Sequence, residues 1–137
     1  MTEQLSPLAL QALAVVEESG AIIGANHAHP HTIRHKGRID LVTETDIAVE
    51  AFLKERLATL APQAGFLAEE SAEDLSLPDT CWIIDPVDGT TNFAHGLPLT
   101  VTSVAYRLNG EIVLGIVNAP LLRECFIAEK GKGAWRN

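Results

Sequence analysis

The stretch Trp82–Pro98, WIIDPVDGTTNFAHGLP, passes from an apolar segment directly into an acidic turn. The apolar residues 81–84 predict a short buried strand. Asp85 and Asp88 follow it, separated only by Pro86 and Val87. Two carboxylates about 4 Å apart repel by roughly 1 kcal/mol in water and about 4 kcal/mol at an effective dielectric near 20. The sequence therefore predicts that a positively charged group is held at the end of this strand.

The segment DPVD can offer oxygen ligands to such a group. Pro86 biases Asp85 toward an extended backbone and removes one N–H, so the two carboxylates and the Val87 carbonyl can converge. Oxygen-only ligation suits a hard cation such as Mg²⁺. Taken alone, the same pattern is more typical of an Asp-Pro turn followed by an Asx cap at Asp88.

The residues that follow favour the ligand-binding interpretation. The sequence Gly89-Thr90-Thr91 allows backbone N–H groups to approach an anion closely. A helix that begins at Asn92 would add its positive end. We therefore expect a phosphate group beside a magnesium ion at this turn.

Two further acidic motifs could contribute to the same site. In Gly65–Ser71, GFLAEES, the pair Glu69 and Glu70 follows an apolar strand, although a solvated helix start explains it equally well. In Asp40–Asp46, DLVTETD, we expect Thr43 or Thr45 to cap a helix, while Asp46 can still serve the site.

Helical patterns come first in the chain and strand patterns come later. Ser6 and Pro7 predict the start of a helix that runs to Gly24, and a second helix carries an apolar face from Val49 to Leu60. Strands are expected over residues 66–68, 81–84, 100–108, 111–117 and 124–128. Asn109-Gly110 is a strong hairpin signal. This order predicts an α+β fold, in which two helices pack on one face of an antiparallel sheet.

The overall composition excludes several classes of partner. The chain has 137 residues, a formal net charge of −8 and a pI near 5.0, which argues against sequence-independent binding to nucleic acid or to anionic membranes. No apolar run approaches the roughly 18 residues of a membrane span, and no leader pattern is present. We expect a cytoplasmic protein in which Cys81 and Cys125 are buried, reduced thiols.

The three acidic motifs together closely resemble the inositol monophosphatase family of magnesium-dependent, lithium-sensitive phosphatases. The signature D-P-x-D-G-T-x-N-F is long and specific, and AEES and DLVTETD occur in the right order. The resemblance covers nearly the whole chain but only the N-terminal half of the family's usual length. It implies that residues 1–137 form a single domain, the N-terminal domain of a layered αβαβα sugar-phosphatase fold, with the C-terminal half absent.

The resemblance also implies a metal site. Glu69, Asp85 and Asp88, together with the Val87 carbonyl, would hold Mg²⁺. Glu70 would lie in the nearby shell and help to position water.

The same resemblance implies roles in phosphate binding and in catalysis. The backbone amides of Gly89 and Thr90 would take the phosphate. Asp46 and Thr90 would orient the nucleophilic water through the threonine hydroxyl. Lys36 would approach metal-bound water or phosphate from the loop of residues 25–39, a possible lid.

Histidines in that loop raise the alternative of a zinc site. His27, His29, His31 and His35 lie in a segment predicted to be a loop rather than a helix, and they have no cysteine near them in the sequence. We favour a solvated lid over a zinc site. For His95 we expect a structural hydrogen-bonding role.

Two departures from the family pattern bear on function. Ala68 replaces the usual glycine, and the second-half Trp-Asp motif, which supplies another metal ligand, is absent. The leading prediction is a hydrolase that acts on an inositol or sugar phosphate monoester, with a homodimer expected. The alternatives are a related phosphatase acting on fructose bisphosphate, histidinol phosphate or phosphoadenosine phosphate, and a truncated metal-binding module with little activity.

Overall fold

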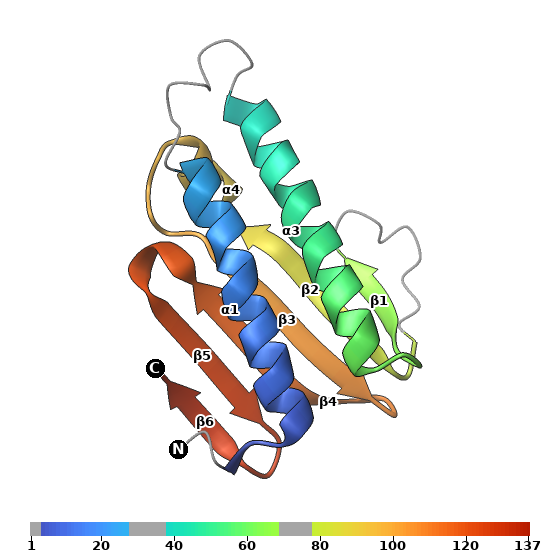
Figure 1. Cartoon of the computed structure of the whole chain (residues 1–137). Helices are drawn as coiled ribbons and strands as arrows, with labels where there is room; N and C mark the ends of the chain where they lie inside the picture. The colour runs from blue at the N-terminus through green and yellow to red at the C-terminus, as the bar shows by residue number, and fades with distance from the viewer. Residues whose placement is uncertain (1–3, 28–37, 69–77) are drawn as a thin grey trace.

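A sheet covered on one face by two long helices forms the molecule (Figure 1). The computed structural model describes residues 4–27, 38–68 and 78–137, and gives the side chains of this set except those of residues 38–41. The helices in this part of the chain are α1 (Pro7–His27), α3 (Arg38–Leu60) and the short α4 (Thr90–Ala94). The predicted α+β class, with both long helices on one face of the sheet, is confirmed.

The sheet has six strands in the order β1-β2-β3-β4-β5-β6. Strands β2 to β6 pair in antiparallel fashion, and for β2 to β5 this was predicted. The predicted all-antiparallel sheet is corrected at β1, which pairs with β2 in parallel. A parallel pair needs a connection of about a dozen residues, and residues 69–80 supply it. The strands are β1 (Gly65–Ala68), β2 (Cys81–Asp88), β3 (Val101–Leu108), β4 (Glu111–Ala119), β5 (Glu124–Glu129) and β6 (Gly133–Arg136), and the 3-10 turn η4 (Pro120–Leu122) joins β4 to β5.

Strand β6 was not among the expected strands. Its four residues pair with β5 around a turn at residues 130–132, and the pairing sets Trp135 opposite Ile127. Because β6 has only the four residues GAWR, with glycine at one end and the charged Arg136 at the other, its sequence carries almost no alternation of apolar and polar residues. Pairing with β5 rather than local propensity therefore defines it.

Ser6 caps helix α1, as the sequence predicted. Its hydroxyl oxygen accepts a hydrogen bond from the Ala9 amide at 3.2 Å. The same residue is tied to the end of β5, because its amide and its hydroxyl both donate to the Glu129 carboxylate, at 2.8 and 2.5 Å. The cap therefore also fixes the start of α1 against the sheet.

Replacing Ser6 with alanine should lower the free energy of unfolding by about 1 kcal/mol, because the Ala9 amide loses its acceptor. Ser6→Asn is the matched control, since asparagine caps helices about as well as serine does. Urea unfolding of both variants measures the effect. An alanine variant as stable as the asparagine variant would contradict the capping role.

By length and composition alone, α1 is long and apolar enough to cross a membrane. The prediction that no segment reaches that length is therefore wrong for α1. In the structure this helix contacts α3 and strands β3 to β5. Its buried residues include Ala12, Val16 and Ile23, which are fully buried. Its apolar composition thus belongs to a helix that packs in the core.

Helix α3 begins at Arg38, well before the predicted apolar face that starts at Val49. The segment DLVTETD therefore lies inside the helix, and the expected cap at Thr43 or Thr45 is wrong. The buried face of the helix extends one turn further toward its N-terminus, to Thr45, which is fully buried. The Thr45 hydroxyl accepts a hydrogen bond from Asn26 Nδ2 at 2.7 Å. A threonine whose hydroxyl is hydrogen-bonded in this way can face the core.

Both cysteines are free and buried, as expected. Burial raises the pKa of the Cys125 thiol to about 11, and the nearby Glu17 carboxylate adds to the rise. The folded state therefore keeps the Cys125 proton in a pH range where the unfolded chain, at the ordinary value of 9.0, loses it. This difference stabilises the fold fully below about pH 9, and the stabilisation is lost as the pH rises toward 11.

We expect the free energy of unfolding to fall more steeply above pH 9 in the native chain than in Cys125→Ala. Part of the slope remains in that variant, because burial also raises the pKa of Cys81. Urea unfolding at several pH values between 8 and 10.5 measures the difference. Identical slopes in the two proteins would show that the Cys125 thiol does not titrate differently on folding.

Candidate active site at the end of strand β2

A β-bulge near the end of β2 brings two acidic side chains to the same face of the sheet. Asp85 pairs with Ser103 and Asp88 pairs with Val101, so Pro86 and Val87 together lie opposite Thr102 alone. Directly opposed residues share a face, and residues two apart on β3 share one too. Without the extra residue, Asp85 and Asp88 would point to opposite faces.

Residues of both paired strands stabilise the bulge. The Thr102 hydroxyl, which is buried, donates to the Pro86 carbonyl at 2.8 Å. Pro86 lacks the N–H that a regular ladder would need, and such residues are typical of bulges. The Val87 side chain is only 3% exposed and joins the hydrophobic core. Its side chain therefore does not reach the surface, and the predicted role of Val87 can involve only its backbone.

The sequence prediction of a strand that ends at Ile84 is corrected by this geometry. Strand β2 continues to Asp88, and the DPVD segment is a bulged strand rather than a turn. Asp85 is half-buried, whereas Asp88 is exposed. Both acids thus lie on the face of the sheet opposite to that of buried Ile84 and Val104.

Gly89 makes the turn from β2 into α4. It has φ 90° and ψ 37°, the left-handed conformation that glycine adopts readily. A Cβ atom at this position would lie 2.5 Å from the Leu99 carbonyl oxygen. The Asn92 side chain donates to the same oxygen at 3.0 Å, so the turn and residues 97–100 are held together.

Helix α4 begins at Thr90, two residues earlier than predicted. The Phe93 amide donates to the Gly89 carbonyl at 2.9 Å, which closes the first turn. The amides that precede Phe93 in the helix have no partner within it, as at any helix start. His95 Nδ1 donates to the Thr91 carbonyl at 2.7 Å, the kind of structural role predicted for it.

A surface pocket with a volume of about 320 Å³ adjoins this turn. It contains one group that sequence reasoning missed, the Thr100 hydroxyl, which is buried and has no hydrogen-bond partner among the described residues. Nothing in the sequence around Thr100 distinguishes it from an ordinary strand residue. The residues that line the pocket are Asp88, Gly89, Asn92, Leu99, Thr100, Val101 and Leu122.

Asp46 and Thr90 lie on two helices that contact each other, α3 and α4. Asp46 is half-buried and Thr90 is exposed. Their predicted action as a pair on a water molecule stays a prediction.

The predicted residues Glu69, Glu70 and Lys36 lie outside the described residues. Within residues 4–27, 38–68 and 78–137, no three His, Cys, Asp or Glu side chains form a group that could hold a metal ion. The acids that the structure does bring to one face are Asp85 and Asp88. Two carboxylates on one face of the sheet, with the Val87 backbone between them in the chain, fit Mg²⁺, which takes few protein carboxylates and keeps several water ligands.

His27 does not favour the zinc alternative. It ends α1, where its Nε2 lies 3.2 Å from the Gly96 carbonyl and its ring contacts Phe93, with ring centroids 6.1 Å apart. Both contacts tie α1 to the segment that follows the site. His29, His31 and His35 lie outside the described residues.

Comparison with known proteins identifies similar chains. A family model, described as the inositol monophosphatase family, matches residues 4–137. The inositol monophosphatase of Dictyostelium discoideum is 45% identical over 130 residues, which is 92% of this chain and 48% of that protein. A fructose-1,6-bisphosphatase/inositol-1-monophosphatase of Thermotoga maritima is 44% identical over 98 residues, covering 72% of this chain and 38% of that protein.

The solved structures agree with the sequence comparison. The structure of inositol monophosphatase from Anabaena (Nostoc) sp. PCC 7120 superposes with a TM-score of 0.77 at 31% identity, covering 100% of this chain and 47% of that one. The chain thus spans about half the length of the Dictyostelium and Anabaena proteins.

Proposed function

Because the chain belongs to the inositol monophosphatase family, we propose that it carries the metal-binding and phosphate-binding part of a magnesium-dependent phosphomonoesterase. The bulge in β2 is the observation that carries this proposal. It sets Asp85 and Asp88 on one face, immediately before the Gly89 turn. Carboxylates next to a tight glycine turn are what joint binding of a divalent cation and a phosphate requires.

In this proposal, Asp85, Asp88 and the Val87 carbonyl hold Mg²⁺, with Glu69 as a further ligand. Bound Mg²⁺ would lower the pKa of a water molecule and neutralise charge on the phosphate oxygens. The carboxylates also fix where the phosphate lies, because they precede the Gly89 turn directly. Substrate binding and metal binding therefore depend on the same bulge.

The backbone amides of Gly89 and Thr90 would donate hydrogen bonds to the phosphate oxygens. Glycine at position 89 lets the phosphate approach the backbone, since no side chain lies in the way. The first backbone amides of α4 have no hydrogen-bond partner within the helix. They supply fixed dipoles at the place where negative charge develops during phosphoryl transfer.

Thr90 and Asp46 would position the attacking water. The Thr90 hydroxyl oxygen accepts a hydrogen bond from the water and donates its own proton to the Asp46 carboxylate. Glu70 helps to hold that water. Water attacks phosphorus, the bond from phosphorus to the alcohol oxygen breaks, and inorganic phosphate and the alcohol are released. No covalent intermediate with the protein is needed.

We propose an inositol or sugar phosphate monoester as the substrate. The relatives named as inositol monophosphatases support this class. The Thermotoga maritima relative, named for two activities, supports fructose bisphosphate as the second candidate substrate. A positively charged ion beside the carboxylates also reconciles an anionic substrate with a chain of net charge −8.

Phosphate release tests the proposed activity. The purified chain is incubated with inositol 1-phosphate or with fructose 1,6-bisphosphate, in the presence of Mg²⁺ or of EDTA, and inorganic phosphate is measured. We expect release that requires Mg²⁺, and faster release from inositol 1-phosphate. If calorimetry shows that Mg²⁺ binds but neither ester is hydrolysed, the alternative of a metal-binding module with little activity replaces the proposal.

A further inference from the structure

A polar pocket with a volume of about 360 Å³ lies between helix α1 and the corner where β4, η4 and β5 meet. We call it the corner pocket. It shares no lining residue with the pocket beside Gly89 at the candidate active site. The residues that line the corner pocket are Glu17, Gly20, Ala21, Asn118, Pro120, Arg123, Cys125 and Asn137.

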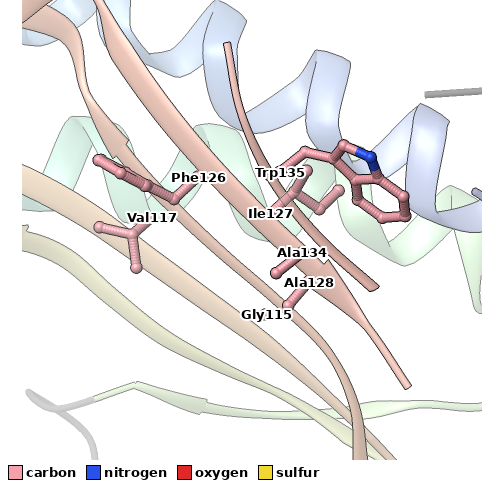
Figure 2. A pocket seen from close by; sticks show the side chains of 7 residues that line it. All are labelled: Gly115, Val117, Phe126, Ile127, Ala128, Ala134 and Trp135. Carbon is pink, nitrogen blue, oxygen red and sulfur yellow. The ribbon is translucent and has the colours of Figure 1, made fainter. Parts of the chain in front are cut away.

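The corner pocket differs in chemistry from a hollow of about 420 Å³ formed by β4, β5 and β6. Apolar side chains and glycine line that hollow, and Figure 2 shows Val117 and Phe126 side by side at its edge. A lining of this kind has no charged group with which to orient a ligand. The corner pocket, by contrast, is lined by a carboxylate, a guanidinium and two carboxamides. It therefore suits a small polar molecule.

Asn118 carries a buried carboxamide that lines the corner pocket. The residue is only 5% exposed and lies on the face of β4 that the helices cover. Its side chain makes no hydrogen bond to another described residue. Buried polar side chains nearly always have a hydrogen-bond partner in the protein or in a bound molecule. The Asn118 carboxamide thus points to a molecule held in the corner pocket.

Helix α1 passes close to this carboxamide at Gly20. A Cβ atom at position 20 would lie 3.0 Å from Asn118 Nδ2 and 2.8 Å from the Pro120 Cβ. Glycine is therefore needed where α1 approaches the corner. The absence of a side chain at this position also keeps the space beside the Asn118 nitrogen clear.

Glu17 and Arg123 bring opposite charges to the corner pocket from two different elements. Burial and, in addition, the Glu17 carboxylate raise the pKa of the Cys125 thiol, so this carboxylate lies near the buried sulfur. Arg123 ends η4 with a φ of 56°. Neither charge takes part in an ion pair within the described part of the chain, whereas the neighbouring Glu18 pairs with Arg56 at 3.0 Å. Both charges are thus available to a ligand.

We propose that the corner pocket binds a small zwitterion of the α-amino acid class. The ammonium group of the ligand would lie at the Glu17 carboxylate. Its carboxylate would lie at the Arg123 guanidinium, which can donate two parallel hydrogen bonds to it. The Asn118 carboxamide both donates and accepts, so it can bind either group. A simple anion or cation fits less well, because it would also meet a like charge at Glu17 or at Arg123.

A titration followed by NMR tests the proposal. The isotope-labelled chain is titrated with L-alanine, with L-alaninamide, which lacks the carboxylate, and with propionate, which lacks the ammonium group. EDTA is present throughout, so the result does not depend on the proposed metal site or activity. We expect L-alanine to shift the side-chain amide signals of Asn118 saturably and to bind at least tenfold more tightly than the other two compounds. Unshifted Asn118 signals, which would leave water as its partner, or equal binding of propionate would overturn the proposal.

Substitutions at the two charges locate the binding. Arg123→Gln and Glu17→Gln should each weaken L-alanine binding at least tenfold, and both positions are exposed, so the variants should fold. Arg123→Gln should also remove the preference for L-alanine over L-alaninamide. Glu18→Gln is the matched control, because Glu18 is the next residue of α1 but pairs with Arg56. Equal losses in the Glu17 and Glu18 variants would contradict binding in the corner pocket.

Discussion

Replacing Asp88 with asparagine should lower magnesium-dependent phosphate release by at least about 100-fold, which corresponds to about 2.7 kcal/mol of transition-state stabilisation. Asp88 is exposed at the end of the bulged strand and shares its face with Asp85. Asparagine keeps the shape of the side chain but removes the negative charge that a divalent cation needs. The loss should therefore appear in Mg²⁺ affinity as well as in the rate.

The matched control for this prediction is Asp79→Asn. Asp79 is also an exposed aspartate, but it lies just before the opposite end of β2. We expect its replacement to leave Mg²⁺ affinity and phosphate release within about twofold of the native values. Calorimetric titration with Mg²⁺ compares the two variants. Equal losses of affinity would remove Asp88 from the proposed metal site.

Gly89→Ala should both destabilise the fold and abolish phosphate binding. Position 89 has a φ of 90°, and the new Cβ would lie 2.5 Å from the Leu99 carbonyl oxygen. Backbone strain of this kind costs about 1–3 kcal/mol. Relief of the clash would also displace the oxygen to which Asn92 donates. The amides proposed to bind the phosphate would then lose their positions.

Gly24→Ala separates this effect from the general consequence of replacing a glycine. Gly24 lies within α1, and a Cβ there meets nothing within 4 Å. This variant should be more stable than the native chain by up to about 1 kcal/mol, because alanine favours helices. Urea unfolding and phosphate release are measured for both variants. A Gly89→Ala protein that is as stable and as active as the native chain would exclude a strained, phosphate-binding turn.

Much of the fold could be predicted because its signals are local. The cap at Ser6, the Asn109-Gly110 turn and the apolar strands each depend on a few neighbouring residues, and the structure has them in place. The elements that differed depend on distant partners. Thr45 can be buried within a helix because Asn26 donates a hydrogen bond to its hydroxyl. Strand β6 forms because it pairs with β5.

The candidate site shows the same division. The sequence predicts Asp85 and Asp88 as a pair, since the motif itself is informative. The means by which they reach one face, a bulge opposite Thr102, depends on the register with β3 and could not be read from the motif. The Thr100 hydroxyl was missed for the same reason, because only the packed structure shows that it is buried beside Gly89.

A double-mutant cycle on the two aspartates tests most directly whether the bulge builds one metal site. Mg²⁺ affinity is measured by calorimetry for the native chain, for Asp85→Asn, for Asp88→Asn and for the double variant. If both carboxylates bind the same ion, either single substitution should remove most of the affinity and the double variant should lose little more. Two losses that simply add, or no loss in either single variant, would show that Asp85 and Asp88 do not hold one ion together.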